Sequence, residues 1–235
     1  MMLPINKRYT VLVGNYGSGK TELAIAIART QRAQEAEGRV ALVDLDIVNP
    51  YFRSAEQHAL LEAEGIEVFM PSFAMSTVDI PALPAQIQAV FEQPYAHVVI
   101  DVGGDDTGAT ALGRYAPYTR ALREEMNVLY VVNPCRPFSA SVEDIAGLYR
   151  LIERQARLTP DHLVNNANLQ EFTTPEVLLA GQALLEKVAA LLGRPVSMIA
   201  GRPHLKDALP DALKPLFFAF EPLMKPEWLV DADEL

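Results

Sequence analysis

The segment from residue 11 to residue 23 reads VLVGNYGSGKTEL and limits the possible architectures more than any other part of the chain. It contains the pattern G-x-x-x-x-G-K-T, which binds phosphate when a strand precedes it and a helix follows it. Residues 9–13 form a short apolar run rich in β-branched side chains, which predicts a buried strand. Residues 21–29 contain strong helix formers and no breaker, which predicts a helix. The order strand, glycine loop, helix therefore predicts a phosphate-binding loop.

The residue types in this loop suit an anion. Glycines allow backbone conformations that a Cβ forbids, so successive N–H groups can converge on one phosphate at the helix N-terminus. Lys20 is predicted to bridge the β- and γ-phosphates as a catalytic residue, and the Thr21 hydroxyl to bind Mg²⁺. The residues expected to contact the nucleotide are Gly14, Asn15, Tyr16, Gly17, Ser18, Gly19, Lys20, Thr21 and Glu22.

Chain length and composition favour a single domain. The chain has 235 residues, and half of them are apolar, which supports one large core. We expect one domain over residues 1–235, with its core at about 8–202 and a C-terminal tail, 203–235, packed on it. The sequence contains no apolar run of membrane-spanning length and no signal-peptide pattern. The single cysteine, Cys135, excludes a disulfide framework, so a cytoplasmic location is expected.

The net charge of −10 limits the kinds of partner that the protein is expected to bind. An acidic surface repels the phosphates of nucleic acids and of anionic lipids. We therefore expect neither nucleic acid nor a membrane as a partner.

Apolar runs alternate with helical patterns along the chain, as in α/β proteins. Strands are predicted at 9–13, 40–43, 66–70, 97–101, 127–133, 162–165 and 195–200, and helices at 21–29, 55–63, 85–91, 109–123 (with a break at Pro117), 141–157 and 174–192. The predicted fold is a three-layer α/β sandwich of the P-loop NTPase kind, with a mostly parallel seven-stranded sheet and helices on both faces. Ligands of such sheets bind at the carboxyl ends of the strands.

Carboxylates follow two of the predicted strands. Asp44 and Asp46 end one strand, and Asp101 ends another and opens the pattern D-x-x-G, completed by Gly104. Several carboxylates beside a triphosphate require a divalent cation, so Thr21, Asp44 and Asp101 are candidate Mg²⁺ ligands. The N–H of Gly104 is a candidate contact of the γ-phosphate. The alternative is that these acids only cap strand ends.

The segment after the predicted strand at 162–165 reads NNAN. A strand-end amide of Asn165 or Asn166 could read the nucleotide base. Guanine-specific GTPases carry an acid in this position, and none follows here, so ATP is favoured over GTP. The alternative is an ordinary asparagine turn.

The chain resembles the MinD/ParA/CobB-type P-loop ATPases of the SIMIBI class. The resemblance rests on the glycine loop at 14–21, on VDLD at 43–46 and on DVGG at 101–104. It implies the strand order 3-2-4-1-5-6-7 and ATP hydrolysis with Asp46 near the attacking water, often with a nucleotide-dependent homodimer.

The sequence also departs from these ATPases. Many members carry a signature lysine at the position of Asn15, and some carry bridging cysteines or a basic C-terminal helix that this chain lacks. Residues 216–230 are apolar but broken by prolines, which favours a tail on the core over a membrane or partner anchor.

Two function classes remain open. One is a regulatory or maturation ATPase whose nucleotide state switches a protein partner, and the other is an enzyme that uses ATP to activate a small anionic metabolite. The loop at 49–54, with Arg53, suits a switch or an anion site, and we favour the switch. Since Asn15 brings no charge, Arg53 is the candidate cation for a face-to-face homodimer.

Overall fold

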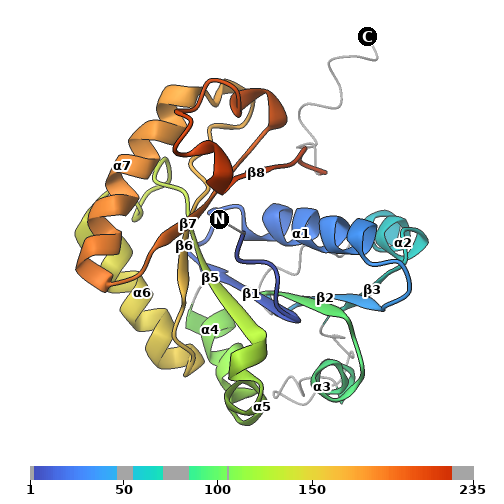
Figure 1. Ribbon diagram of the computed structural model, residues 1–235. Coiled ribbons are helices and arrows are strands. Elements are labelled where there is room, and N and C mark those ends of the chain that lie inside the picture. The colour runs from blue at the N-terminus through green and yellow to red at the C-terminus, as the bar shows by residue number, and fades with distance from the viewer. Residues whose placement is uncertain (1–2, 47–54, 71–84, 105, 224–235) are drawn as a thin grey trace.

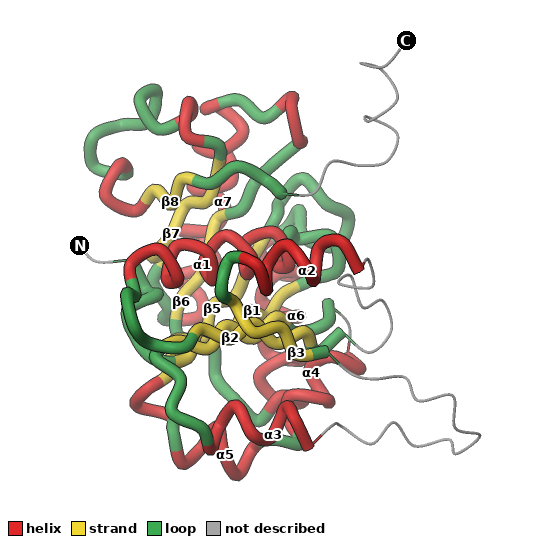
Figure 2. Tube along the Cα trace, turned by 90° about the vertical axis from the view of Figure 1, so that its right-hand side faces the viewer, coloured by secondary structure: helices red, strands yellow, loops and turns green. Residues whose placement is uncertain are grey.

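The computed structural model describes residues 3–46, 55–70, 85–104 and 106–223. In these ranges the chain forms one parallel sheet between two layers of helices (Figures 1 and 2). The strands are β1 (Tyr9–Gly14), β2 (Val40–Asp44), β3 (Ile66–Phe69), β4 (His97–Asp101), β5 (Met126–Val132), β6 (His162–Asn165), β7 (Val196–Gly201) and β8 (Phe217–Ala219). The α-helices are α1 (Lys20–Gln34), α2 (Ala55–Ala63), α3 (Ala85–Glu92), α4 (Asp106–Gly113), α5 (Ala116–Ala121), α6 (Val142–Ala156) and α7 (Pro175–Leu192). Short 3-10 helices lie at Arg123–Glu125, Gln170–Phe172, Pro203–Leu205 and Lys214–Leu216.

The order of the strands is β3-β2-β4-β1-β5-β6-β7-β8, and every neighbouring pair is parallel. The predicted α/β fold class is confirmed, and the first seven strands follow the order that the resemblance implies. The prediction of seven strands was one too few. The eighth, β8, pairs with β7 through Ile199 and Phe217 and lies in the stretch assigned to a packed tail.

The sheet is buried on both faces, as parallel sheets usually are. All six residues of β1 are buried, and neighbours along it face opposite layers. Val11 belongs to a core cluster that also contains residues of α3, α4, α6 and α7, whereas Leu12 belongs to a second cluster with residues of α1, α2 and the strand β8. Figure 1 shows α1 and α2 on one side of the sheet and α3, α4 and α5 on the other.

The helices lie close to the predicted positions. Ser141 caps α6, because its Oγ accepts a hydrogen bond of 3.1 Å from the N–H of Asp144. The helix predicted at 109–123 is two helices, and the break precedes Tyr115 rather than lying at Pro117. Pro117 instead lies in the first turn of α5, where its missing N–H removes no helical hydrogen bond. Within the described ranges, no helix has both the length and the apolar character needed to cross a bilayer.

The sheet register brings the predicted motifs to one edge. Asp101 at the end of β4 is paired with Asp44 of β2 and with Leu12 of β1. β1 then runs through Gly14 into the glycine loop and α1. The acids and the N-terminus of α1 therefore lie together at the carboxyl edge of the sheet.

Candidate nucleotide site

The glycine loop between β1 and α1 has a backbone that only glycine fits at two positions. A Cβ on Gly14 would lie 2.2 Å from the carbonyl oxygen of Val131 in β5. Gly19 has a φ of 83° and caps α1 without a side-chain hydrogen bond. The first N–H groups of α1 are thus not covered by a capping side chain, which is the arrangement that binds anions at helix N-termini.

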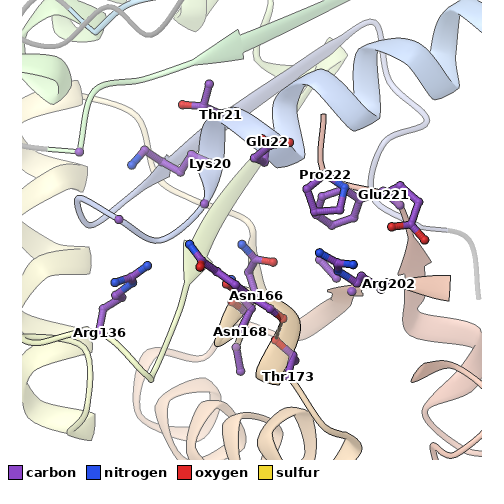
Figure 3. A pocket seen from close by; sticks show the side chains of 18 of the residues that line it. Lys20, Thr21, Glu22, Arg136, Asn166, Asn168, Thr173, Arg202, Glu221 and Pro222 are labelled. Atoms are coloured by element: carbon purple, nitrogen blue, oxygen red, sulfur yellow. Dashed lines mark hydrogen bonds between the residues drawn. The ribbon is translucent and has the colours of Figure 1, made fainter. Parts of the chain in front are cut away.

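Lys20 lies across this loop. Its side chain is largely buried, at 7% exposed, and its Nζ donates a hydrogen bond of 2.9 Å to the carbonyl oxygen of Asn15. Figure 3 shows the Lys20 ammonium extended beside the loop. A positive charge is therefore held over the loop backbone.

Thr21 and Asp101 meet at the same place. The Thr21 hydroxyl donates a hydrogen bond of 2.6 Å to Asp101 Oδ2, while Asp101 Oδ1 is buried and has no hydrogen-bond partner in the described part of the chain. Burial raises the pKa of Asp101 to about 6, against the opposing effects of the Lys20 charge and the Thr21 hydrogen bond. An unsatisfied carboxylate oxygen beside a hydroxyl is a donor set that suits Mg²⁺, which prefers oxygen ligands.

This donor set is incomplete by itself. Within the described residues, no three His, Cys, Asp or Glu side chains gather as a metal cluster. Mg²⁺ usually takes one or two protein carboxylates and completes its shell with water and substrate phosphates. Thr21 and Asp101 therefore fit a magnesium ion that arrives with a nucleotide.

The two acids at the end of β2 have different positions. Asp44 is fully buried, lies outside the cleft wall, and accepts a hydrogen bond of 2.8 Å from the backbone N–H of Asp46 through its Oδ1. Asp46 lines the cleft, beside Gly103. Asp44 is thus placed to fix the backbone of Asp46, and its predicted direct contact with a metal stays a prediction.

The segment after β4 touches the glycine loop. A Cβ on Gly104 would lie 2.6 Å from both the N and the Cα of Tyr16. Only glycine allows this approach, because real Cβ atoms do not come so close to backbone. A movement of the Gly104 segment would therefore displace the glycine loop at Tyr16.

The two asparagines at the end of β6 differ in position. Asn165 is fully buried; its Nδ2 donates to the carbonyl of Leu178 in α7, and its Oδ1 accepts from the N–H of Ala167. Asn165 does not line the cleft. Asn166 does, but its Nδ2 donates a hydrogen bond of 2.7 Å to the carbonyl oxygen of Ser18. Asn166 therefore ties the glycine loop to β6.

Asn15 holds the glycine loop to a second neighbour. Its Nδ2 donates to Ser139 Oγ at 3.0 Å, and its Oδ1 accepts from the N–H of Tyr16 at 2.8 Å. Asn15 does not line the cleft, whereas Tyr16 does. The side chain at the signature-lysine position is thus used to join the loop to the segment after β5.

A cleft of about 860 Å³ joins these features. Its lining also includes residues for which the sequence analysis had predicted no role: Arg136 after β5, Asn168 after β6, Glu171 in the 3-10 helix that follows, Arg202 after β7, and Phe220, Glu221 and Pro222 after β8. Figure 3 shows Arg136 and Arg202 on opposite sides of the Asn166 and Asn168 side chains. Strand β8 carries its following segment to the cleft, where the N–H of Leu223 donates a hydrogen bond of 2.9 Å to Glu22 Oε2. The predicted site residues at 49–54, including Arg53, lie outside the described residues.

Comparisons with known proteins give only distant likenesses. No protein-family model matches the chain, and no curated protein sequence matches it significantly. A crystal structure of FlhF complexed with GTP and Mg²⁺ aligns with 84% of the chain at 16% identity and a TM-score of 0.48, and the match covers 67% of FlhF. The receptor FtsY from Mycoplasma mycoides aligns with 82% of the chain at 18% identity and a TM-score of 0.48, covering 59% of that protein. FtsY from Elizabethkingia anophelis, a signal recognition particle receptor, aligns with 92% at 18% identity and a TM-score of 0.49, covering 62% of that protein. The chain thus spans about three fifths to two thirds of these proteins, and at this similarity the likeness does not extend to ligand or partner.

Proposed function

We propose that the protein binds Mg·ATP in this cleft and hydrolyses it. The observation that carries the proposal is the hydrogen bond of 2.6 Å between Thr21 and Asp101, beside an Asp101 oxygen without a hydrogen-bond partner in the described ranges. The pair lies next to Lys20 and at the N-terminus of α1. A cation, a helix N-terminus and a magnesium donor set at one cleft end fit a triphosphate better than any uncharged ligand.

The roles proposed for the residues follow from their chemistry. Lys20 neutralises the β- and γ-phosphates, and the N–H of Gly104 contacts the γ-phosphate. Thr21 and Asp101 would hold Mg²⁺, which neutralises phosphate charge when bound. Asp46 orients the water that attacks the γ-phosphorus, since its carboxylate faces the cleft and its backbone N–H is bonded to Asp44.

The base is proposed to be adenine, with Asn168 rather than Asn165 as the nearby amide. Asn168 lines the cleft, and its backbone is held because its N–H donates to Asn133 Oδ1 at 3.2 Å. Guanine is the second candidate, because Glu171 also lines the cleft and a carboxylate can accept hydrogen bonds from the guanine N1–H and N2–H.

We expect ATP to bind more tightly than GTP in a competition titration with a fluorescent nucleotide. No acid directly follows Asn165 or Asn166 in the chain, so a guanine would lack the carboxylate that usually pairs with it. The variant Glu171→Gln is the control: it keeps the shape of the side chain and removes its charge. GTP bound more tightly by the wild type, with the preference lost in Glu171→Gln, would replace ATP by GTP in the proposal.

We propose further that the nucleotide state switches a protein partner. Tyr16 in the glycine loop is 69% exposed, and Phe138 on the segment bonded to Asn15 is 82% exposed with a φ of 60°. Large exposed aromatic side chains on segments that touch the phosphate site support a surface read by another protein. The alternative, an enzyme acting on a small anionic metabolite, is supported by the second arginine in the cleft, Arg202.

An activation assay separates the two functions. We expect ATP hydrolysis to be slow with the protein alone and to rise with the protein fraction of a cell extract. The extract is dialysed, and its two fractions are added separately to the wild type and to the double variant Tyr16→Ser, Phe138→Ser. Stimulation by the retained fraction that the double variant loses supports the switch, whereas stimulation by the dialysate supports the metabolite enzyme.

A further inference from the structure

Arg136, an arginine beside the glycine loop, makes no hydrogen bond or ion pair through its side chain with any residue that the structure describes. Arg136 follows β5 and lines the cleft with Gly17 and Lys20. Its side chain lies along the glycine loop, with Nε 3.7 Å and Cδ 3.8 Å from the position that a Cβ on Gly17 would take. Figure 3 shows its guanidinium directed toward the loop. The Arg136 side chain is therefore within van der Waals reach of the loop at Gly17.

The positive charge of Arg136 is not neutralised by an ion pair within the described part of the chain. Its side chain makes no hydrogen bond and no ion pair there, although the chain carries 30 acidic and 20 basic residues. By contrast, Arg29, Arg39 and Arg123 are each paired with a carboxylate. An arginine that stays unpaired in an acidic protein is available to an anionic ligand.

The segment that carries Arg136 is held in place from several sides. The N–H of Arg136 donates to the carbonyl of Asn133, and the carbonyl of Arg136 accepts from the N–H of Ser139. Ser139 Oγ in turn accepts from Asn15 in the glycine loop. Phe138 between them adopts a left-handed backbone, with a φ of 60°, which a non-glycine residue adopts only when its surroundings enforce it. The arginine is thus positioned by a fixed turn rather than by a free loop.

The phosphate end of the cleft needs a second cation. Lys20, Arg136 and Arg202 are the basic residues on its described wall, and Arg202 lies on the far side of the asparagines (Figure 3). Asn15 brings no charge and points to Ser139. Hydrolysis of a triphosphate increases negative charge on the oxygen that leaves with the diphosphate, so a cation there accelerates the reaction.

We propose that Arg136 is a catalytic arginine supplied by the same chain, which contacts the β- and γ-phosphates and stabilises the charge that develops during hydrolysis. This inference rests on the proposed nucleotide hydrolysis. A water oxygen forms a bond to the γ-phosphorus, and the bond between that phosphorus and the β,γ-bridging oxygen breaks. The products are a nucleoside diphosphate and inorganic phosphate, and the proton of the water leaves with the phosphate or to solvent. Arg136 donates hydrogen bonds and exchanges no proton.

The test compares Arg136→Ala with Arg150→Ala, which removes an exposed arginine of α6. We expect Arg136→Ala to lower kcat by roughly 10²- to 10³-fold, as loss of one transition-state donor does. The Kd for Mg·ATP, measured by calorimetry, should change by less than about tenfold, because the charge acts mainly in the transition state. Arg136→Lys should recover part of the rate, and guanidinium ion added at millimolar concentration should restore part of it in Arg136→Ala only.

Binding of ADP with aluminium fluoride provides a readout that does not depend on turnover. The wild type and Arg150→Ala should retain this transition-state mimic, and Arg136→Ala should not. An unchanged kcat in Arg136→Ala, or equal retention of the mimic by all variants, overturns the role of Arg136 and leaves the proposed function standing. A wild type that binds no nucleoside triphosphate overturns both.

Discussion

Replacement of Lys20 by alanine is expected to reduce the affinity for Mg·ATP below detection in calorimetry. Lys20 is the cation held over the glycine loop, with its Nζ 2.9 Å from the carbonyl oxygen of Asn15 and its side chain 7% exposed. Two unit charges about 4 Å apart near a protein surface interact with roughly 4 kcal/mol. A loss of that size corresponds to about a thousandfold in Kd.

The control for this variant is Lys187→Ala, which removes an exposed lysine from α7. Both variants should keep the far-ultraviolet circular dichroism of the wild type, because the Lys20 ammonium donates its hydrogen bond to the carbonyl oxygen of Asn15 in a loop and not to a strand. The same Kd in Lys20→Ala and in the wild type would contradict the proposal that this loop binds the phosphates of the nucleotide.

The variant Asp46→Asn is expected to bind ATP like the wild type and to slow its hydrolysis by about 10²-fold or more, which is typical for loss of a group that positions or deprotonates the attacking water. Asparagine keeps the shape of the side chain but presents an N–H₂ group where the carboxylate would accept a hydrogen bond. Phosphate release in a single turnover measures the effect. Asp207→Asn, at an exposed position, is the matched control. A normal rate in Asp46→Asn would leave that carboxylate with a structural role only.

The same variant tests the proposed homodimer, because it holds ATP without consuming it. Light scattering should give twice the mass with ATP and the mass of the monomer with ADP. Arg53→Ala should then remove the dimer while leaving ATP binding by the monomer nearly unchanged. An equal mass with ATP, with ADP and without nucleotide would exclude a nucleotide-gated dimer and would favour the enzyme that acts on a metabolite.

Local signals made the glycine loop and the strand order predictable. The residues of the glycine-loop motif are contiguous, at 14–21, so the motif is visible in the sequence itself. The apolar runs on either side are long enough to indicate their secondary structure. Asp101 was predictable as well, because a carboxylate that directly follows a buried apolar run must lie at the end of a strand. The structure brings it to Thr21 by the pairing of Leu12 with Asp101.

The sequence did not identify which asparagine at the end of β6 lies at the cleft. Side chains alternate between the faces of a strand, so a boundary shifted by one residue exchanges inward and outward positions. β6 ends at Asn165, whose side-chain amide donates a hydrogen bond to a carbonyl of α7, and the following loop begins at Asn166. The sequence NNAN contains no signal that distinguishes these positions.

The missed parts of the site depend on tertiary structure. β8 has only three residues, Phe217–Ala219, and lies between Pro215 and Pro222. A segment of this length is too short to show the alternation of apolar and polar residues that indicates a strand. Arg136 and Arg202 are single arginines in irregular segments, and only the order of the strands brings them to one cleft. No pattern of neighbours in the sequence marks such residues.

The position of β1 in the centre of the sheet has a consequence for the order of folding. Tyr9 of β1 pairs with Val98 of β4 and with Met126 of β5, so the strand that leads into the glycine loop pairs with strands that lie far along the chain. Contacts between residues far apart in the chain form slowly, because a long loop must close first. During synthesis the glycine loop leaves the ribosome before β4 and β5, so it lacks both flanking strands until Val132 has emerged and lacks the bond from Asn166 to Ser18 until Asn166 has followed. We therefore expect a nascent chain to acquire the proposed affinity for phosphate only after Asn166 has left the ribosome.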